Sequence, residues 1–150
     1  MPVGSYAESL SYLFESTTTT TLYTVGLNAS VANFGQQFGY GPSSVGIGGT
    51  VTQSGLKSSL VNLNKITGTI TTTADALAGG SVTGFTLLNT LIASTDYVLV
   101  QHITGGTLTA YNLQATPNSG YASIYLRNIT AGSLSEALTI QFLVIKSQTN

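Results

Sequence analysis

The chain has 150 residues, a formal net charge of −1 and no cysteine, and charged side chains make up 6% of it, against roughly 25% in a typical soluble domain. Four basic residues are too few to follow a phosphate backbone, which argues against nucleic acid as a partner. The longest aliphatic or aromatic runs, such as Tyr97 to Val100, are far shorter than the roughly 18 residues of a membrane span, so we expect no membrane insertion.

A positive mean hydropathy of +0.29, combined with so few charges, predicts self-association. Thr, Ser, Asn, Gln and Gly supply the polarity that charged side chains supply elsewhere. A monomer with such a surface has weak electrostatic repulsion and associates readily. The simplest interpretation is that much of the surface is buried against other chains.

The N-terminal stretch, Met1 to Gly26, is expected to be an extended arm. The run Thr17 to Thr21 is β-branched, which favours extended backbone. Such an arm could pair with another chain or serve as a solvated linker. The following segment, Asn33 to Gly49, is dense in glycine and aromatic residues and predicts an ordered loop, and it contains no phosphate-binding glycine pattern.

One short helix is predicted over Thr52 to Thr67. Leu56, Leu60 and Leu63 recur at helical spacing, and Gly68 follows as a terminator. The apolar stripe is narrow. It suits packing either against a partner chain or against the sheet of the same chain.

From Val82 onward the pattern is strongly β. Five strands bounded by turn residues are predicted, over Phe85–Ile92, Tyr97–Ile103, Thr107–Ala115, Ala122–Ile129 and Ala137–Ile145. Regular strands and turns with no helix between them are typical of an antiparallel β-sandwich or jelly roll. In the last strand Phe142 shares one face with Ile140 and Val144, and we expect it in the core.

The flexible stretch Thr71 to Gly80 separates the helical pattern from the β pattern. We therefore predict a mainly β protein in two parts. Residues 1–80 would be an N-terminal attachment and oligomerisation segment with the extended arm and the short helix. Residues 81–150 would be a C-terminal β-sandwich domain.

The sequence indicates no catalytic, cofactor or metal site. His102 is the only histidine, so a Ser-His-Asp triad would have to use it, with Asp96 six residues upstream and no serine in a nucleophile-elbow context. Asp96 and Glu136 could be neighbours across a sheet, as a glycosidase pair requires, but both stand at predicted strand ends. Metal ligands are scattered. We expect no enzymatic activity, and expect His102 to be a hydrogen-bonded strand or interface residue.

The remaining functional signal is the chemistry of the surface. Tyr, Asn, Ser and Gly with few charges is the composition of adaptable recognition surfaces. The candidate contacts with a receptor or partner are Tyr111, Asn118 and Tyr121, around the loop Thr116 to Gly120. The alternative is that these tyrosines pack at a subunit interface.

The C-terminal half, from Thr95 to Lys146, resembles the terminal β-domains of bacteriophage structural proteins, especially tail-fibre and knob proteins of tailed phages. The features that carry the resemblance are a strand over Tyr97 to His102, a strand from Ala122 that ends in Arg-Asn, and a final strand that ends in Phe-Leu-Val-Ile-Lys. The segment Phe38 to Gly68 resembles a glycine-aromatic loop and helix of fibre-like proteins from phages of aquatic bacteria. It departs from them in its smaller number of charged residues and in the absence of a histidine near its end.

The resemblance implies a virion structural protein, assembled in the cytoplasm of the bacterial host, that forms a homotrimer and contacts other virion proteins. Three functions stay open. The first is a tail fibre or fibre tip that attaches to the host, with a host cell-surface glycan as a candidate receptor. The second is a capsid decoration (cement) protein that stabilises the phage head. The third is a free carbohydrate-binding module, which the absence of Trp disfavours.

Overall fold

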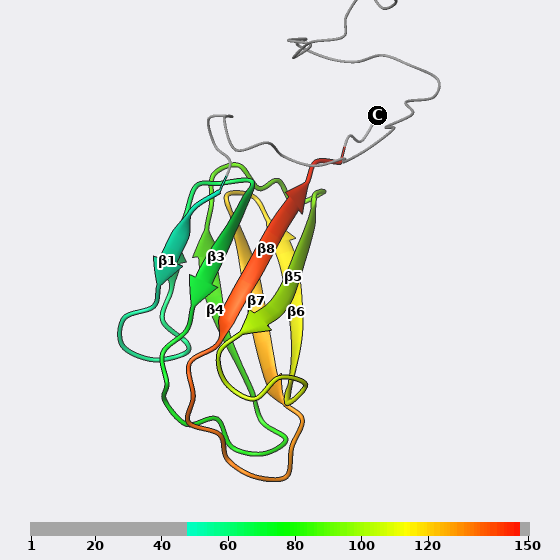
Figure 1. Cartoon of the computed structure of the whole chain (residues 1–150). Helices are drawn as coiled ribbons and strands as arrows, with labels where there is room; N and C mark the ends of the chain where they lie inside the picture. The colour runs from blue at the N-terminus through cyan, green and yellow to red at the C-terminus, as the bar shows by residue number, and fades with distance from the viewer. Residues whose placement is uncertain (1–47, 148–150) are drawn as a thin grey trace, which may run out of the picture. The chain divides into compact units, whose positions relative to one another are not determined.

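The computed structural model describes residues 48–147, so the expected N-terminal arm lies outside the described residues. The chain divides into two units, Met1–Phe38 and Gly39–Asn150, and every described residue belongs to the second. Residues 48–147 contain eight strands and no helix (Figure 1). The strands are β1 (Thr50–Thr52), β2 (Val61–Asn62), β3 (Thr67–Thr71), β4 (Val82–Leu88), β5 (Tyr97–Thr104), β6 (Tyr111–Asn118), β7 (Tyr121–Asn128) and β8 (Thr139–Ile145).

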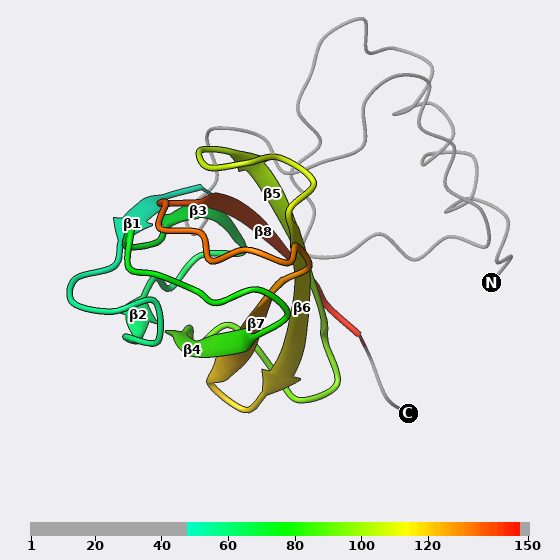
Figure 2. The same ribbon diagram turned by 90° about the horizontal axis from the view of Figure 1, so that it is seen from below.

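The strands form two four-stranded sheets that stack face to face (Figure 2). One, the β8 sheet, has the order β1-β3-β8-β5, and the other, the β7 sheet, has the order β2-β4-β7-β6. The pairs β1–β3 and β2–β4 are parallel, and the remaining pairs are antiparallel. The predicted mainly β sandwich is therefore confirmed, with both sheets mixed rather than purely antiparallel.

The core lies between the two sheets because apolar residues alternate along their strands. In β8, Ile140, Phe142 and Val144 are at most 1% exposed, and in β7 the residues Ile124 and Leu126 are fully buried. The prediction that Phe142 is a core residue is confirmed. Residues in the connections between strands complete the core, namely Leu77, Ile92, Ala110 and Leu138.

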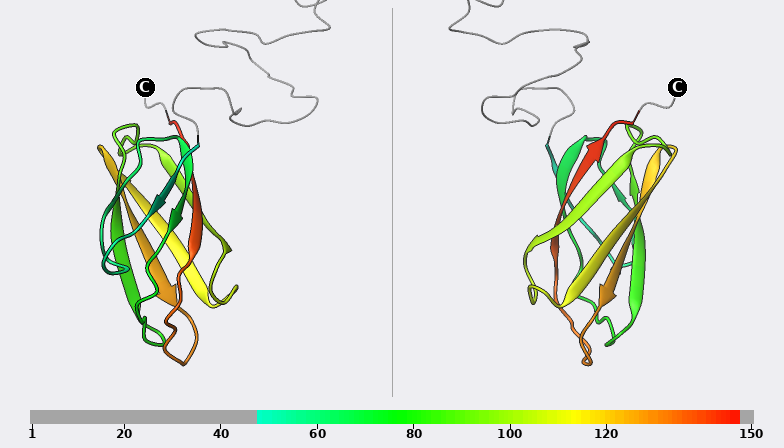
Figure 3. Two further views of the ribbon diagram at one scale, coloured as in Figure 1. Left: turned by 60° about the vertical axis from the view of Figure 1, so that its left-hand side comes forward. Right: turned by 90° about the vertical axis from the view of Figure 1, so that its right-hand side faces the viewer.

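The edge strands β5 and β6, one from each sheet, lie side by side along one flank of the sandwich (Figures 2 and 3). The rings of His102 on β5 and Tyr111 on β6 meet edge to face there, with centroids 6.0 Å apart. This contact links the two sheets at the flank.

The predicted loop Thr116 to Gly120 is shorter in the structure, because Thr116, Pro117 and Asn118 belong to β6 and only the remainder forms the tight hairpin between β6 and β7. Asn118 pairs with Tyr121, which leaves Ser119 and Gly120 as the loop, and Gly120 has a φ of +84° that favours glycine. Pro117 lies on β6, an edge strand, where the lack of an N–H is tolerated.

The helix predicted over Thr52 to Thr67 does not form. These residues form the end of β1, a loop, β2 and the start of β3. Leu56 and Leu60 are 59% and 60% exposed, whereas Lys57 between them is 1% exposed, so the apolar stripe is not the buried side. Gly55 has a φ of +95°, which no helix accommodates.

The sandwich also contains residues that the sequence analysis placed in the N-terminal segment. Strands β1, β2 and β3 all precede residue 80, yet β2 pairs with β4 and β3 pairs with β8, while β1 joins the same sheet by pairing with β3. The expected boundary at residues 80 and 81 therefore falls inside the sandwich. The reason is physical: β1 and β2 have 3 and 2 residues, too few to show an alternating pattern in the sequence.

Candidate functional site

His102 faces the flank of the sandwich and is held by main-chain groups. Its Nε2 lies 3.1 Å from the carbonyl oxygen of Thr104 and 2.6 Å from that of Gly105. Within residues 48–147 no carboxylate or serine hydroxyl hydrogen-bonds to this ring. The expectation of a hydrogen-bonded strand residue is met, and the structure does not bring Asp96 to it.

The buried Asp96 holds two segments in place, the turn before β5 and the residues that follow β8. Its carboxylate accepts hydrogen bonds from the backbone N–H of Ala93 at 2.8 Å and of Ser147 at 3.1 Å, and it pairs with the Lys146 ammonium at 2.5 Å. Burial alone would raise the pKa of Asp96, but these hydrogen bonds and the Lys146 charge outweigh it and lower the pKa below the ordinary aspartate value. The carboxylate is thus kept ionised by structural contacts.

Asp96 and Glu136 are not a carboxylate pair. Asp96 stands just before β5, whereas Glu136 accepts a 2.6 Å hydrogen bond from the Thr107 N–H, beyond the other end of that strand. The 8 residues of β5 rise about 3.3 Å each, which separates the two acids by more than the roughly 10 Å that a glycosidase pair spans.

The three predicted contact residues divide between two sides of the β7 sheet. Tyr111 is only 8% exposed and faces the interior, so it is not available to a receptor in this fold. Burial raises its pKa to about 12, and the Glu136 carboxylate adds to the rise. Asn118 and Tyr121 are directly paired and share the outer face of the β7 sheet, so the structure brings these two together.

The outer face of the β8 sheet carries no charged side chain. Its residues, identified by register and alternation and called here the β8 face, are Thr50, Thr52, Thr67, Thr69, Thr71, Tyr97, Leu99, Gln101, Thr139, Gln141, Leu143 and Ile145. Apolar residues gather at one end. Tyr97 pairs with Ile145, and Leu99 pairs with Leu143. Tyr97, Leu99 and Ile145 are 65%, 54% and 42% exposed, and together they form an exposed apolar patch.

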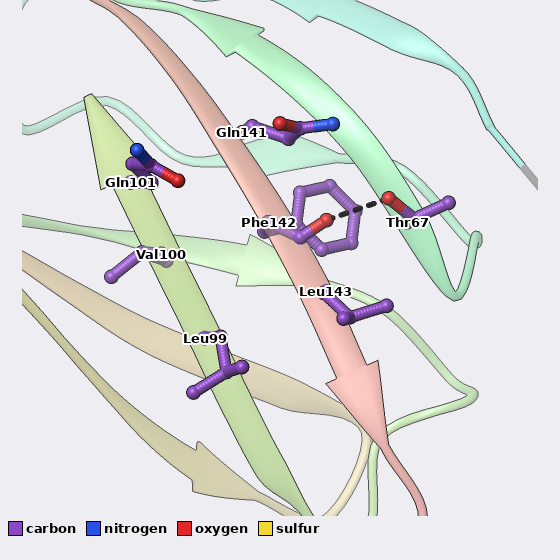
Figure 4. Close-up of a pocket in the computed structure, with 7 residues that line it drawn as sticks. All are labelled: Thr67, Leu99, Val100, Gln101, Gln141, Phe142 and Leu143. Atoms are coloured by element: carbon purple, nitrogen blue, oxygen red, sulfur yellow. Dashed lines mark hydrogen bonds between the residues drawn. The ribbon is translucent and has the colours of Figure 1, made fainter. Parts of the chain in front are cut away.

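A shallow depression of about 290 Å³ lies on this face, across β3, β8 and β5 (Figure 4). Leu99 and Leu143 stand beside it, and Gln101 pairs with Gln141 next to them. The Thr67 hydroxyl donates a 2.9 Å hydrogen bond to the carbonyl of Phe142 at its border. The depression is therefore apolar with an amide rim, and it contains no acid, base or nucleophile arranged for catalysis.

The outer face of the β7 sheet is different in character. Called here the β7 face, it consists of Val82, Gly84, Thr86, Leu88, Asn112, Gln114, Thr116, Asn118, Tyr121, Ser123, Tyr125 and Arg127. Two tyrosines and the exposed Val82 and Leu88 stand among hydroxyl and amide side chains, with Arg127 as the single charge of this face. Such a mixture of aromatic and uncharged polar groups suits adaptable contact with a polar ligand.

A groove of about 460 Å³ lies where the β7 face meets the loop before β2. It is lined by Ser58, Leu60, Gly84, Phe85, Thr86, Ser123 and Tyr125. The ring of Tyr125 packs on Gly84 so closely that a Cβ atom there would lie 2.8 Å from the ring. Sequence reasoning missed Tyr125. The alternation of the strand could have identified it: Tyr125 lies between the buried Ile124 and Leu126, so its side chain points to the outer face.

Residues 48–147 hold no cluster of three or more His, Asp or Glu side chains that could bind a metal ion. The same residues include no helix of the length and apolarity that crossing a bilayer requires. Comparison of the chain with protein-family models, with curated proteins and with solved structures gives no match in any of the three.

Proposed function

We propose that this protein is a structural subunit of a bacteriophage particle, a homotrimeric tail fibre or fibre tip that adheres to the host surface. The observation that carries the proposal is the β8 face, which is free of charge and exposes Tyr97, Leu99 and Ile145 at one end. An exposed apolar cluster of this kind marks a protein contact surface. Three copies are what the resemblance to fibre and knob proteins implies, and a contact that closes on rotation makes such a ring.

The buried charges support a structural role rather than a catalytic one. Lys57 and Asp96 are 1% and 3% exposed, and the hydrogen bonds of their side chains hold connections between strands. His102 is engaged with two backbone carbonyls. Lys57, Asp96 and His102 therefore each have structural partners. The β7 face, on the other side of the sandwich, is left for adhesion.

The location in the particle is tested by electron microscopy of virions labelled with an antibody against residues 48–147. Label at the tail, in dozens of copies per particle, is the expected result. Label distributed over the head in hundreds of copies would replace the fibre with a capsid decoration protein. Purified virions that carry no label would overturn the proposal of a virion protein.

A further inference from the structure

The groove beside Tyr125 has the features of a site for an uncharged ligand rich in hydroxyl groups. Its lining contains no acidic or basic side chain. The hydroxyls of Ser58, Thr86, Ser123 and Tyr125 make no hydrogen bond with any residue in the range 48–147, so each keeps its donor and acceptor capacity. A volume of about 460 Å³ is in the range of small-molecule sites, which is about 300–1,000 Å³.

Two apolar walls accompany these hydroxyls. Tyr125 is 43% exposed and Leu60 is 60% exposed, and both border the groove. One side of the Tyr125 ring packs over Gly84, which has no side chain to displace it. A pyranose ring has the complementary structure: one face presents C–H groups that pack on an aromatic ring, and the edge presents hydroxyls that exchange hydrogen bonds with side-chain hydroxyls.

The loop that carries Leu60 and Ser58 is itself held in position. The buried Lys57 ammonium donates to the carbonyls of Thr73 at 2.7 Å and Asp75 at 2.5 Å, and the Gln53 amide donates to the carbonyl of Ser59 at 2.7 Å. Because the two walls come from a fixed loop and a central strand, the groove is formed before any ligand binds. Preformed sites lose little entropy when they bind a small ligand.

We propose that this groove binds a neutral pyranose of a surface glycan, with Tyr125 stacked on the sugar ring and Thr86 and Ser123 bonded to its hydroxyls. The inference rests on the adhesive part of the proposed function and names the ligand class. A neutral sugar is favoured over a charged one because the single charge of the β7 face, Arg127, does not line the groove.

The test is titration of the ¹⁵N-labelled chain with methyl α-D-glucopyranoside, methyl α-D-mannopyranoside and methyl β-D-galactopyranoside, followed by amide NMR. At least one of these sugars should shift the amides of Gly84, Thr86, Ser123 and Tyr125. Tyr125→Ala should weaken that binding at least tenfold, and Tyr125→Phe should retain most of it. Leu108→Ala, at a 56% exposed loop position that belongs to neither outer face, is the control and should leave the affinity unchanged.

No shift with any of the three sugars, shifts confined to other residues, or an affinity unaffected by Tyr125→Ala would overturn the inference. So would preferential binding of sialic acid that is lost in Arg127→Gln, since the ligand would then be an acidic sugar on the neighbouring surface. The molecular mass of each preparation, measured alongside, separates this inference from the proposed function. A trimer without sugar binding leaves the virion role standing, whereas a monomer that binds sugar leaves the site standing.

Discussion

Lys57, Asp96 and Asn128 are polar residues whose side chains are buried, and each is bonded to the main chain. The Asn128 side-chain NH₂ donates to the carbonyls of Leu77 and Gly132, both at 2.8 Å. Its side-chain oxygen accepts a hydrogen bond from the backbone N–H of Thr130. Buried polar groups persist where they are hydrogen-bonded in this way. These residues therefore hold the long connections of the sandwich in place, and their polar groups are used in structural hydrogen bonds.

Substitution of the core residue Phe142 should cost much of the stability. Phe142→Ala removes a ring that is 1% exposed, and such changes cost about 3–5 kcal/mol in unfolding free energy. Urea denaturation followed by circular dichroism measures the change. Leu108→Ala, at a 56% exposed position in a loop, is the control and should change the free energy by less than about 0.5 kcal/mol. Equal effects of the two substitutions would contradict the assigned core.

The Asp96 carboxylate should make the folding stability depend on pH in the acidic range. The pKa of Asp96 in the folded chain is below the unfolded value of about 3.9. The ionised carboxylate therefore contributes its full stabilisation of the fold above that value, and this stabilisation is lost as the pH falls through the folded pKa. The melting temperature of the wild type should fall between pH 5 and pH 2. Asp96→Asn should be less stable at neutral pH and should show a smaller further loss in acid. Parallel melting curves for the two proteins across this range would exclude the carboxylate as the cause.

The inward residues of β7 and β8 could be predicted from the sequence because period-two alternation is visible in each strand. The same rule would have placed Tyr111, which is in phase with Leu113 and Ala115, on the inner side of β6. The sequence could not show that Asn118 and Tyr121 are paired neighbours with Tyr125 farther along the same face. That arrangement depends on the hairpin register and on Gly84 of the adjacent strand.

At the scale of elements, the segment between β1 and β3 is organised by one buried lysine rather than by an apolar stripe. The spacing of Leu56, Leu60 and Leu63 is helical, but the backbone N–H of Lys57 donates to the Asp75 carboxylate at 2.8 Å, and its ammonium reaches two carbonyls of the same distant segment. Contacts that span 16 to 18 residues are invisible to local periodicity. Tertiary structure therefore overrides the local helical pattern here.

Removal of this lysine should loosen the loop. Lys57→Ala leaves two carbonyls and the Asp75 carboxylate without the ammonium, a loss on the order of 3 kcal/mol. Hydrogen–deuterium exchange should accelerate across residues 53–60 more than in β7 and β8. The adjacent Leu56→Ala, at a 59% exposed position, is the control and should leave exchange nearly unchanged. Uniform acceleration over the whole sandwich would contradict a local anchoring role.

At the scale of the whole molecule, the two outer faces of the sandwich differ in composition. The β8 face is uncharged and apolar at one end, whereas the β7 face combines tyrosines with hydroxyl and amide groups beside the groove. The low charge of the sequence predicts association in general terms. Composition could not predict which side chains gather on each face, because that depends on which residues of β5 and β8 the sheet register turns outward.

The central claim, that the β8 face joins copies of this chain, is tested most directly by multi-angle light scattering of the purified protein at micromolar concentration. The wild type should have three times the 15.5 kDa mass of one chain. Leu99→Glu places a charge at a 54% exposed position of the β8 face and should yield a folded monomer, while Val82→Glu at a 59% exposed position of the β7 face should stay trimeric. A wild-type mass of 15.5 kDa, or a trimer that Leu99→Glu leaves intact, would contradict the claim.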